Sequence, residues 1–450
     1  MALTGIEIFK KLPKTNCGKC GVPTCLAFAM KLAAGQAELG ACPFVSEQAK
    51  AELDEASAPP IRPLAIGAGE KAFKTGGETV LFRHEKRFVS PTGIAVLISD
   101  QMAEAEVDGR LARLKELKYH RVGLTLEADL AAIKSDSGDP AKFAALVQKV
   151  KNQSDGKGLI LMSENPQVLA AGAKACAGSR PLLYGATKAN ADAVAAVAKE
   201  TSAPVGIKAG SLDELIELVN KLSAAGLKDL VLDSGSRTVR EALNDQIIIR
   251  RAALLKKFRP FGFPTITFPC EMTTDPMQET LLASLFIAKY GGIVVLSNLE
   301  GHSLFPLLLE RMNLFTDPQR PMATTEGIYE IGGPNENSPV LLTSNFSLTY
   351  FIVSGEIEGS RVPAWLLIKD TEGLSVMTAW AAGKFGADVI APFVKKCGIA
   401  DKVKHRKLIV PGYAAVISGE LEEELPDWKI LIGPREAAHI PAFLKVWKPE

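Results

Sequence analysis

Short apolar runs rich in branched side chains recur along the middle of the chain, separated by segments with helical periodicity. Uninterrupted runs of this kind are typical of strands buried on both faces of a parallel sheet. Segments between them, such as SLDELIELVNKLSAAG at 211–226, place apolar residues three and four positions apart, as crossover helices do. The eight runs lie at residues 93–99, 121–126, 158–163, 181–185, 204–209, 229–235, 264–269 and 292–298.

This alternation predicts an α/β protein with a (β/α)8 barrel of the TIM type over residues 93–320, closed by a helix at 302–315. Polar residues at the ends of such strands line the mouth where barrel enzymes place catalytic groups. Their commoner role is to cap the next helix or to satisfy loop backbone, and both interpretations stay open. The residues are Asp100, Glu164, Lys208, Asp233, Glu271 and Asn298.

The strand and helix pattern restarts near residue 325. Four further apolar runs, each followed by a helical segment, predict a small doubly wound, Rossmann-like α/β domain over residues 325–450. Ligands of such sheets bind outside the carboxyl ends of the strands, here TSNFSLT, DTEGLSV, PGYAA and GPREA. The helix start near GLSV offers backbone N–H groups to an anion such as a phosphate. The four runs lie at 338–345, 363–370, 405–412 and 427–433.

Before the barrel, the pattern is that of a small separate module. Thr4 and Glu7 form a capping-box pair for one short helix, and Thr24 is a candidate cap for a second helix that Gly35 would end. Residues 58–92, rich in Pro, Gly and charge, are expected to form a linker with one short hairpin near 76–89. The module itself is expected to cover residues 1–57.

Four of the seven cysteines fall inside this module with the spacing Cys-x2-Cys-x4-Cys-x16-Cys. Three close thiols and one distant thiol favour an iron–sulfur site over zinc sites built from two close pairs. The spacing therefore predicts a [4Fe–4S] cluster, with zinc or inert cysteines as alternatives. The candidate ligands are Cys17, Cys20, Cys25 and Cys42.

Composition mainly excludes classes of partner and of cellular location. The net charge of +1 and a hydrophobic fraction of 47% indicate no partner among nucleic acids or membranes. No apolar run reaches about 18 residues and the first residues lack the features of a secretory signal, so a cytoplasmic protein is expected.

Together, CGKCGVPTC…AC, the barrel pattern, and TSNFSLTYF, TEGLSV and GPREA resemble the large (gamma) subunits of the corrinoid iron–sulfur protein over essentially the whole chain. The resemblance implies a methyl carrier. Its cobalamin cobalt would accept a methyl group from methyltetrahydrofolate through a separate methyltransferase and pass it to CO dehydrogenase/acetyl-CoA synthase. The cluster would re-reduce inactive cobalt, and a small subunit would complete a heterodimer.

The resemblance places cobalamin at the strand ends of the C-terminal domain. The only His-x-x-Gly, His120 to Gly123, has Lys118 where other cobalamin modules carry Asp, so a base-off corrinoid without a protein imidazole is expected. No catalytic residue is assigned. The expected contacts are Thr343, Asn345, Thr349, Gly373, Leu374, Ser375, Val376, Gly412, Tyr413, Gly433, Pro434 and Ala437.

Two other functions remain open from the sequence. Polar residues at the barrel mouth would suit an enzyme that itself binds a methylated pterin and transfers the methyl group. Alternatively, the chain would be an electron-transfer subunit whose C-terminal domain docks a partner. Methyltetrahydrofolate binding by the barrel would favour the first, and purified protein lacking cobalt would favour the second.

Overall fold

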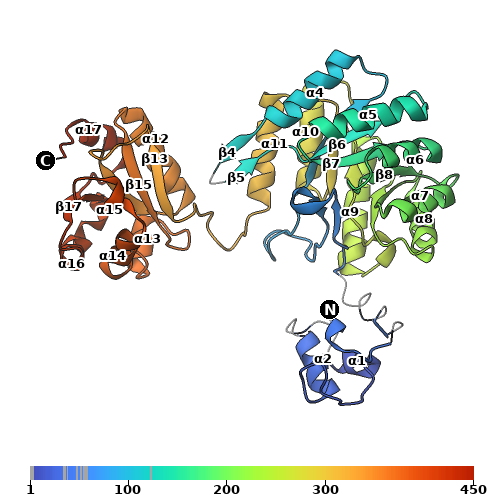
Figure 1. Ribbon diagram of the computed structural model, residues 1–450, viewed down its shortest axis with the longest axis horizontal. Helices are drawn as coiled ribbons and strands as arrows, with labels where there is room; N and C mark the ends of the chain where they lie inside the picture. The colour runs from blue at the N-terminus through green and yellow to red at the C-terminus, as the bar shows by residue number, and fades with distance from the viewer. Residues whose placement is uncertain are drawn as a thin grey trace. The chain divides into compact units, whose positions relative to one another are not determined.

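The computed structural model describes residues 5–33, 37, 39–46, 49–50, 53, 59–121 and 124–449. The chain divides into two compact units. The first comprises residues 1–81, 89–116 and 128–311, and the second comprises residues 82–88, 117–127 and 312–450. Figure 1 shows the small N-terminal module, the barrel and the C-terminal sheet along the chain.

The barrel is an eight-stranded, all-parallel sheet within the described part of the chain. Seven strands match the sequence prediction in place, and their apolar residues are buried on both faces. The sheet order is β10-β9-β8-β7-β6-β3-β12-β11. The bounds are β3 (Gly93–Ser99), β6 (Leu130–Lys134), β7 (Gly158–Met162), β8 (Leu182–Ala186), β9 (Val205–Lys208), β10 (Leu230–Asp233), β11 (Ile266–Thr267) and β12 (Ile293–Leu296).

Helices of the barrel begin where short polar side chains cap them. Asp139, Asn165, Ser211, Thr238 and Asp275 each accept a hydrogen bond from a backbone N–H of the first turn. The helices are α4 (Glu104–Glu116), α5 (Pro140–Gln153), α6 (Pro166–Ala175), α7 (Ala191–Thr201), α8 (Leu212–Ala224), α9 (Val239–Leu255), α10 (Pro276–Ala288) and α11 (Gly301–Leu314), the last being the predicted closing helix.

The prediction of one barrel strand is wrong. Of the predicted run 121–126, residues 122–123 lie outside the described residues and the others do not join the barrel sheet: β4 (Tyr119–Arg121) and β5 (Leu124–Leu126) form a separate antiparallel pair. Their side chains are mostly exposed, whereas the next run, LAAIK, is buried and forms β6 between β3 and β7. The alanines of this run gave a weaker strand signal than the branched residues of RVGLTL.

A hairpin seals the barrel at the N-terminal ends of its strands. It consists of β1 (Leu64–Ile66) and β2 (Phe73–Thr75), so strands in this segment lie earlier than the 76–89 expected from the sequence. Leu64 and Ile66 belong to the barrel core, and Phe73 packs against it. A Cβ at Gly93 would lie 2.5 Å from the Phe73 ring, so only glycine fits there.

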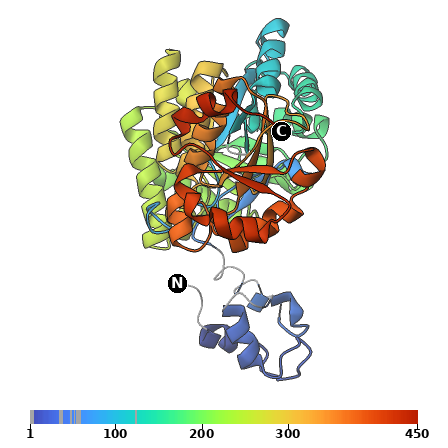
Figure 2. The same cartoon turned by 90° about the vertical axis from the view of Figure 1, so that its left-hand side faces the viewer.

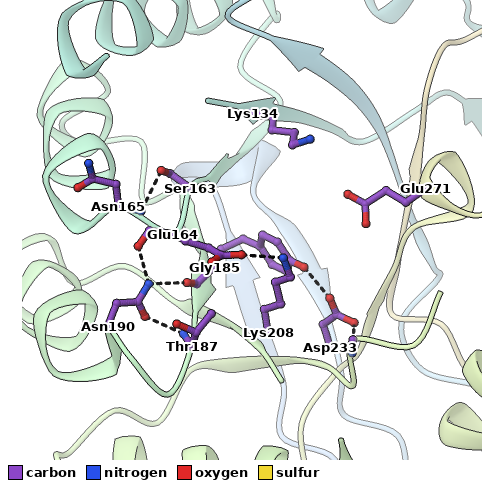
Figure 3. Close-up of polar contacts among 12 residues, drawn as sticks. Lys134, Ser163, Glu164, Asn165, Gly185, Thr187, Asn190, Lys208, Asp233 and Glu271 are labelled. Carbon is purple, nitrogen blue, oxygen red and sulfur yellow. Dashed lines mark hydrogen bonds and ion pairs between the residues drawn. The ribbon is translucent and has the colours of Figure 1, made fainter. Parts of the chain in front are cut away.

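At the opposite end, several polar residues at or just after the strand ends are paired with other polar groups. Lys208 Nζ lies 2.7 Å from Glu164 Oε1, and Lys134 Nζ lies 2.9 Å from Asp136 Oδ1. In Figure 3, Lys134 and Glu271 point toward one another across the mouth. Asp100 accepts hydrogen bonds from the backbone N–H groups of Asp136 and Ser137, each at 2.9 Å. The bonds to Asp100 satisfy loop backbone, as the capping interpretation expects, whereas the two ion pairs join side chains only.

The barrel closes at a weak seam between β10 and β11, where β11 has only two residues and one isolated bridge joins Leu232 to Thr265. Asp233, only 4% exposed, accepts from Tyr184 Oη at 2.5 Å and from Arg237 Nη2 at 2.9 Å. Arg237 also pairs with Glu271, which follows β11. Burial, followed by the nearby Asp233 charge, raises the pKa of Tyr184, so its phenol remains a donor. Arg237 therefore bridges the seam.

The C-terminal unit holds a five-stranded sheet in its described residues, in the order β13-β15-β14-β16-β17. Four parallel strands coincide with the predicted runs: β14 (Val340–Ser344), β15 (Ala364–Lys369), β16 (Lys407–Val410) and β17 (Lys429–Ile432). The unpredicted β13 (Gly327–Ile331) pairs antiparallel with β15 at one edge.

Helices cover both faces of this sheet (Figures 1 and 2). One core joins the strands to α12 (Ser347–Ser360) and α17 (Ile440–Lys445) through Ile357 and Leu444. The other core joins them to helices that follow β15 and β16: α13 (Val376–Ala381), α14 (Ala387–Lys396), α15 (Ile399–Lys402), the 3-10 helix η5 (Gly412–Ile417) and α16 (Ser418–Glu424).

The N-terminal module contains α1 (Gly5–Lys11), α2 (Cys25–Ala33) and the 3-10 helix η1 (Leu39–Ala41). Thr24 caps α2 as expected, accepting from Ala27 N at 3.1 Å. The predicted cap Thr4, the predicted helix end at Gly35 and Gly123 of the His-x-x-Gly lie outside the described residues. Within the described ranges, no helix combines the length and apolar character needed to cross a membrane.

We expect Arg237→Met to lower the stability of the barrel by about 3 kcal/mol, because it leaves the buried Asp233 carboxylate without its cation. The chain's four tryptophans, Trp365, Trp380, Trp428 and Trp447, all lie in the C-terminal unit. The urea midpoint followed by far-UV circular dichroism should therefore fall. The midpoint followed by tryptophan fluorescence should not change.

Lys188→Met is the matched control. It removes an exposed pair with Glu217, so the expected change is below about 0.5 kcal/mol. Equal circular dichroism midpoints for Arg237→Met and the wild-type chain would contradict a structural role for the bridge.

Candidate functional site

A cavity of about 280 Å³ lies at the carboxyl ends of the strands in the C-terminal sheet. It opens where β14 stands between β15 and β16. The chain leaving β14 forms α12 on one face, whereas the chain leaving β15 and β16 covers the other face. Connections diverge at this point, and a crevice between them is the usual ligand position in open parallel sheets.

The structure brings most of the expected C-terminal contacts together around this cavity. They come from the end of β14, the start of α12, the start of α13 and the turns that follow β16 and β17. The lining residues among them are Thr343, Thr349, Ser375, Val376, Tyr413, Gly433, Pro434 and Ala437.

The other four expected contacts, Asn345, Gly373, Leu374 and Gly412, do not line it. Asn345 is buried and bonded to the loop that follows β15. Leu374 packs against the core on the α13 face. A Cβ at Gly412 would lie 2.6 Å from Gly433 O, so this glycine permits close approach of two turns and does not present a ligand contact.

Sequence reasoning missed the apolar part of the lining. The branched residues at the ends of β14 and β16 and along α12 face the cavity, although they read as ordinary core positions. The only signal was their place at the C-terminal end of each run. The missed residues are Leu341, Leu342, Ile352, Val353, Met377, Ile409, Val410, Pro411, Arg435 and Ile440.

Polar groups in the cavity are few and specific. The hydroxyls of Thr343, Thr349 and Ser375 and the guanidinium of Arg435 accompany the apolar walls. The N-cap side chains of α12 and α13 make no cap hydrogen bond. In α12, however, Ser347 N already donates to Met322 O at 3.0 Å. This combination suits a ligand with an apolar body and a few acceptor groups.

Tyr413 stands at the rim. Its hydroxyl donates to Glu436 Oε1 at 2.7 Å, and this bond raises the pKa of Tyr413 because ionisation would set a phenolate beside a carboxylate. Around it, large apolar side chains are exposed: Met377 by 44%, Trp380 by 42% and Leu348 by 57%. An apolar rim of this kind indicates that something further covers the cavity.

The four clustered cysteines lie in the N-terminal module. Cys25 and Cys42 are buried in its small core, Cys20 packs against that core, and Cys17 is exposed. The backbone N–H of Lys19 and the Thr15 hydroxyl lower the pKa of Cys17, favouring the thiolate that binds metal. Cys25 N donates to Asn16 Oδ1 at 2.8 Å, fixing the loop to the start of α2.

These cysteines fit an iron–sulfur cluster by their chemistry. All four are free thiols, three of them share one core, and Gly18 and Gly21 between them adopt left-handed backbone angles. Among the described residues, no three His, Cys, Asp or Glu side chains already stand as a ready metal site.

Comparison with known proteins covers nearly the whole chain. The family model described as CO dehydrogenase/acetyl-CoA synthase delta subunit matches residues 63–444, and a model described as a putative Fe-S cluster matches residues 12–44. The corrinoid/iron-sulfur protein large subunit of Moorella thermoacetica is 47% identical over 445 residues, covering 99% of each chain. The acetyl-CoA decarbonylase/synthase complex subunit gamma of Methanopyrus kandleri is 36% identical, covering 98% of this chain and 97% of its own.

Among solved structures, the phospho-2-dehydro-3-deoxyheptonate aldolase of Thermotoga maritima has a TM-score of 0.40 at 13% identity, covering 58% of this chain and 74% of its own. A likeness at that level supports no functional conclusion. The two full-length matches identify the family, because they span the cysteine module, the barrel and the C-terminal sheet together. The chain belongs to the family of corrinoid/iron–sulfur protein large subunits and acetyl-CoA decarbonylase/synthase gamma subunits.

Proposed function

We propose that this chain is the large subunit of a corrinoid iron–sulfur protein and serves as a methyl carrier. The observation that carries the proposal is the cavity at the ends of β14 and β16, built from the same TSNFSLT, TEGLSV and GPREA segments that mark the family. A four-cysteine module on the same chain supports it. When bound, the corrinoid cobalt carries a methyl group from methyltetrahydrofolate, delivered by a separate methyltransferase, to acetyl-CoA synthase, and a [4Fe–4S] cluster supplies the electron that restores it.

In this proposal the C-terminal domain, residues 325–450, holds the corrinoid. The apolar cavity would take the nucleotide tail, with Thr343, Thr349 and Ser375 donating to its acceptor atoms. The larger macrocycle would lie over the rim formed by Met377 and Tyr413, both of which are exposed. The described residues that line the cavity include no histidine, in keeping with the proposed base-off corrinoid without a protein imidazole.

The remaining parts of the chain would form a cluster module, a linker and a barrel that accompany that domain. Residues 1–57 would form the cluster module, with Cys17, Cys20, Cys25 and Cys42 as ligands, and residues 58–92 and 93–320 would form the linker and the barrel. A small subunit is the proposed partner, because the exposed Leu348 and Trp380 beside the rim would otherwise leave a reactive cofactor open to water. The proposed use of reduced thiols as cluster ligands supports a cytoplasmic location.

Thr349→Trp is expected to abolish cobalt retention by filling the cavity from the first turn of α12. Iron content and the iron–sulfur absorption of the same sample should not change. Anaerobic metal analysis with an absorption spectrum measures both. Glu358→Trp, at an exposed position near the other end of α12, should retain both metals.

A chain truncated after residue 320 should likewise lose cobalt and keep iron. Cobalamin retained by that truncated chain would refute the proposed location. Nitrogen superhyperfine splitting in the cobalt(II) EPR spectrum of the full chain would refute the base-off state. Wild-type protein holding iron but no cobalt would favour a purely electron-transferring subunit.

Cys42→Ala should remove most of the iron, because the module then offers only three of its four proposed thiolates. Cobalt should remain. Cys397→Ala changes a half-buried cysteine of the C-terminal unit and serves as the control, with iron expected at the wild-type level. Unchanged iron and an unchanged spectrum in Cys42→Ala would show that Cys42 is not a ligand.

A further inference from the structure

Asn345 follows β14 at the edge of the cavity but does not line it. It is 3% exposed, and both the oxygen and the nitrogen of its amide are hydrogen-bonded. The Oδ1 atom accepts hydrogen bonds from Thr371 N at 3.0 Å, Thr371 Oγ1 at 2.9 Å and Gly373 N at 2.9 Å. The Nδ2 group donates to Asp370 Oδ1 at 2.7 Å. One side chain from β14 thus holds the loop that leaves β15.

That loop cannot hold its shape through local preference. Glu372 and Gly373 both have left-handed backbone angles, with φ of 57° and 76°. The left-handed region is unfavourable for a glutamate by roughly 1 kcal/mol or more. A Cβ at position 373 would lie 2.8 Å from Pro321 O, so the turn is also tightly packed. The hydrogen bonds to Asn345 and Asp370 offset this cost.

The loop leads directly into the start of α13. Ser375, Val376 and Met377 come directly after it, and all three line the cavity. Leu374 N bonds back to Thr371 O at 3.2 Å, so the residues held by Asn345 connect directly to this first turn. A shift of the loop would move the Ser375 hydroxyl and the uncapped N–H groups of α13 relative to any ligand in the cavity.

We propose that Asn345 is a positioning residue for corrinoid binding: it fixes the first turn of α13 against the ligand without touching the ligand itself. The inference rests on the proposed function, since it concerns the same cavity. It also gives a chemical reason for an amide at this position. Only a group that accepts on one side and donates on the other satisfies both the loop N–H groups and the Asp370 carboxylate.

An aspartate at position 345 has nearly the same shape but cannot donate. Asn345→Asp would set two carboxylates at the 2.7 Å contact now made by Nδ2 and Asp370 Oδ1. Asp370 also accepts from Glu372 N at 2.9 Å, so it cannot turn away without releasing the loop. In the double variant Asn345→Asp/Asp370→Asn the amide introduced at position 370 donates to the carboxylate introduced at position 345, which removes the repulsion, and that carboxylate still accepts from Thr371 and Gly373. The Glu372 N–H then loses the acceptor it has in Asp370 Oδ1, so the restoration is partial.

The test compares the full chain carrying Asn345→Asp, Asp370→Asn or both substitutions, each reconstituted anaerobically with cobalamin. We expect Asn345→Asp to weaken cobalamin binding at least tenfold, Asp370→Asn to weaken it less than threefold, and the double variant to bind at least threefold more tightly than Asn345→Asp. Hydrogen exchange of the peptide spanning 370–379 should be fastest in Asn345→Asp and slower in the double variant. Iron content should be equal in all samples.

Tryptophan fluorescence checks that the C-terminal unit of each variant is folded at the temperature of the binding assay. Wild-type cobalamin affinity in a folded Asn345→Asp protein would overturn the inference. A double variant that remains as weak as Asn345→Asp would also overturn it, because the loss would not then come through Asp370. If Asn345→Asp does not fold, Thr371→Val replaces it, and unchanged affinity in that variant overturns the inference. Failure of wild-type protein to bind cobalamin would instead reject the proposed function.

Discussion

The feature on which the functional part of this molecule depends is the change of direction at β14. Because α12 crosses to one face of the sheet and the helices after β15 and β16 cross to the other, the connections diverge beside the carboxyl end of β14. The resulting crevice is a product of chain topology, and side chains only shape it. Short segments from four strand ends can then meet at one ligand although they are far apart in sequence.

The strands were largely predictable because burial on both faces leaves an uninterrupted apolar run. That signal identified β7, β8 and β12 in the barrel and all four parallel strands of the C-terminal sheet. This signal failed where the residue types of a run do not match its burial. RVGLTL has branched residues but forms part of an exposed antiparallel pair, and the alanine-rich β6 is buried with few branched side chains. The edge strand β13 is only partly buried, so it gave no clear run.

The site was predictable in outline for a different reason. Hydroxyl and glycine residues at strand ends stand out in a sequence, and eight of the twelve expected contacts do line the cavity. The apolar lining could not be distinguished from core, because Leu341 and Ile409 lie on the same strands as truly internal residues. Asn345 shows the opposite difference, because it was expected to contact the ligand but does not line the cavity. A polar residue beside a site can be fully engaged with backbone, and only its hydrogen-bond partners reveal this.

The barrel has a further property that follows from where the chain enters and leaves it. The β1–β2 hairpin bonds to the N-terminal side of the strands, with Gly67 N donating to Arg180 O just before β8. At the other end of the barrel sequence, α11 runs back to the same side, where Arg311 donates to Thr92 O just before β3. Both ends of the barrel segment are therefore at one pole. Fusion or circular permutation at this pole would leave the mouth of the barrel undisturbed.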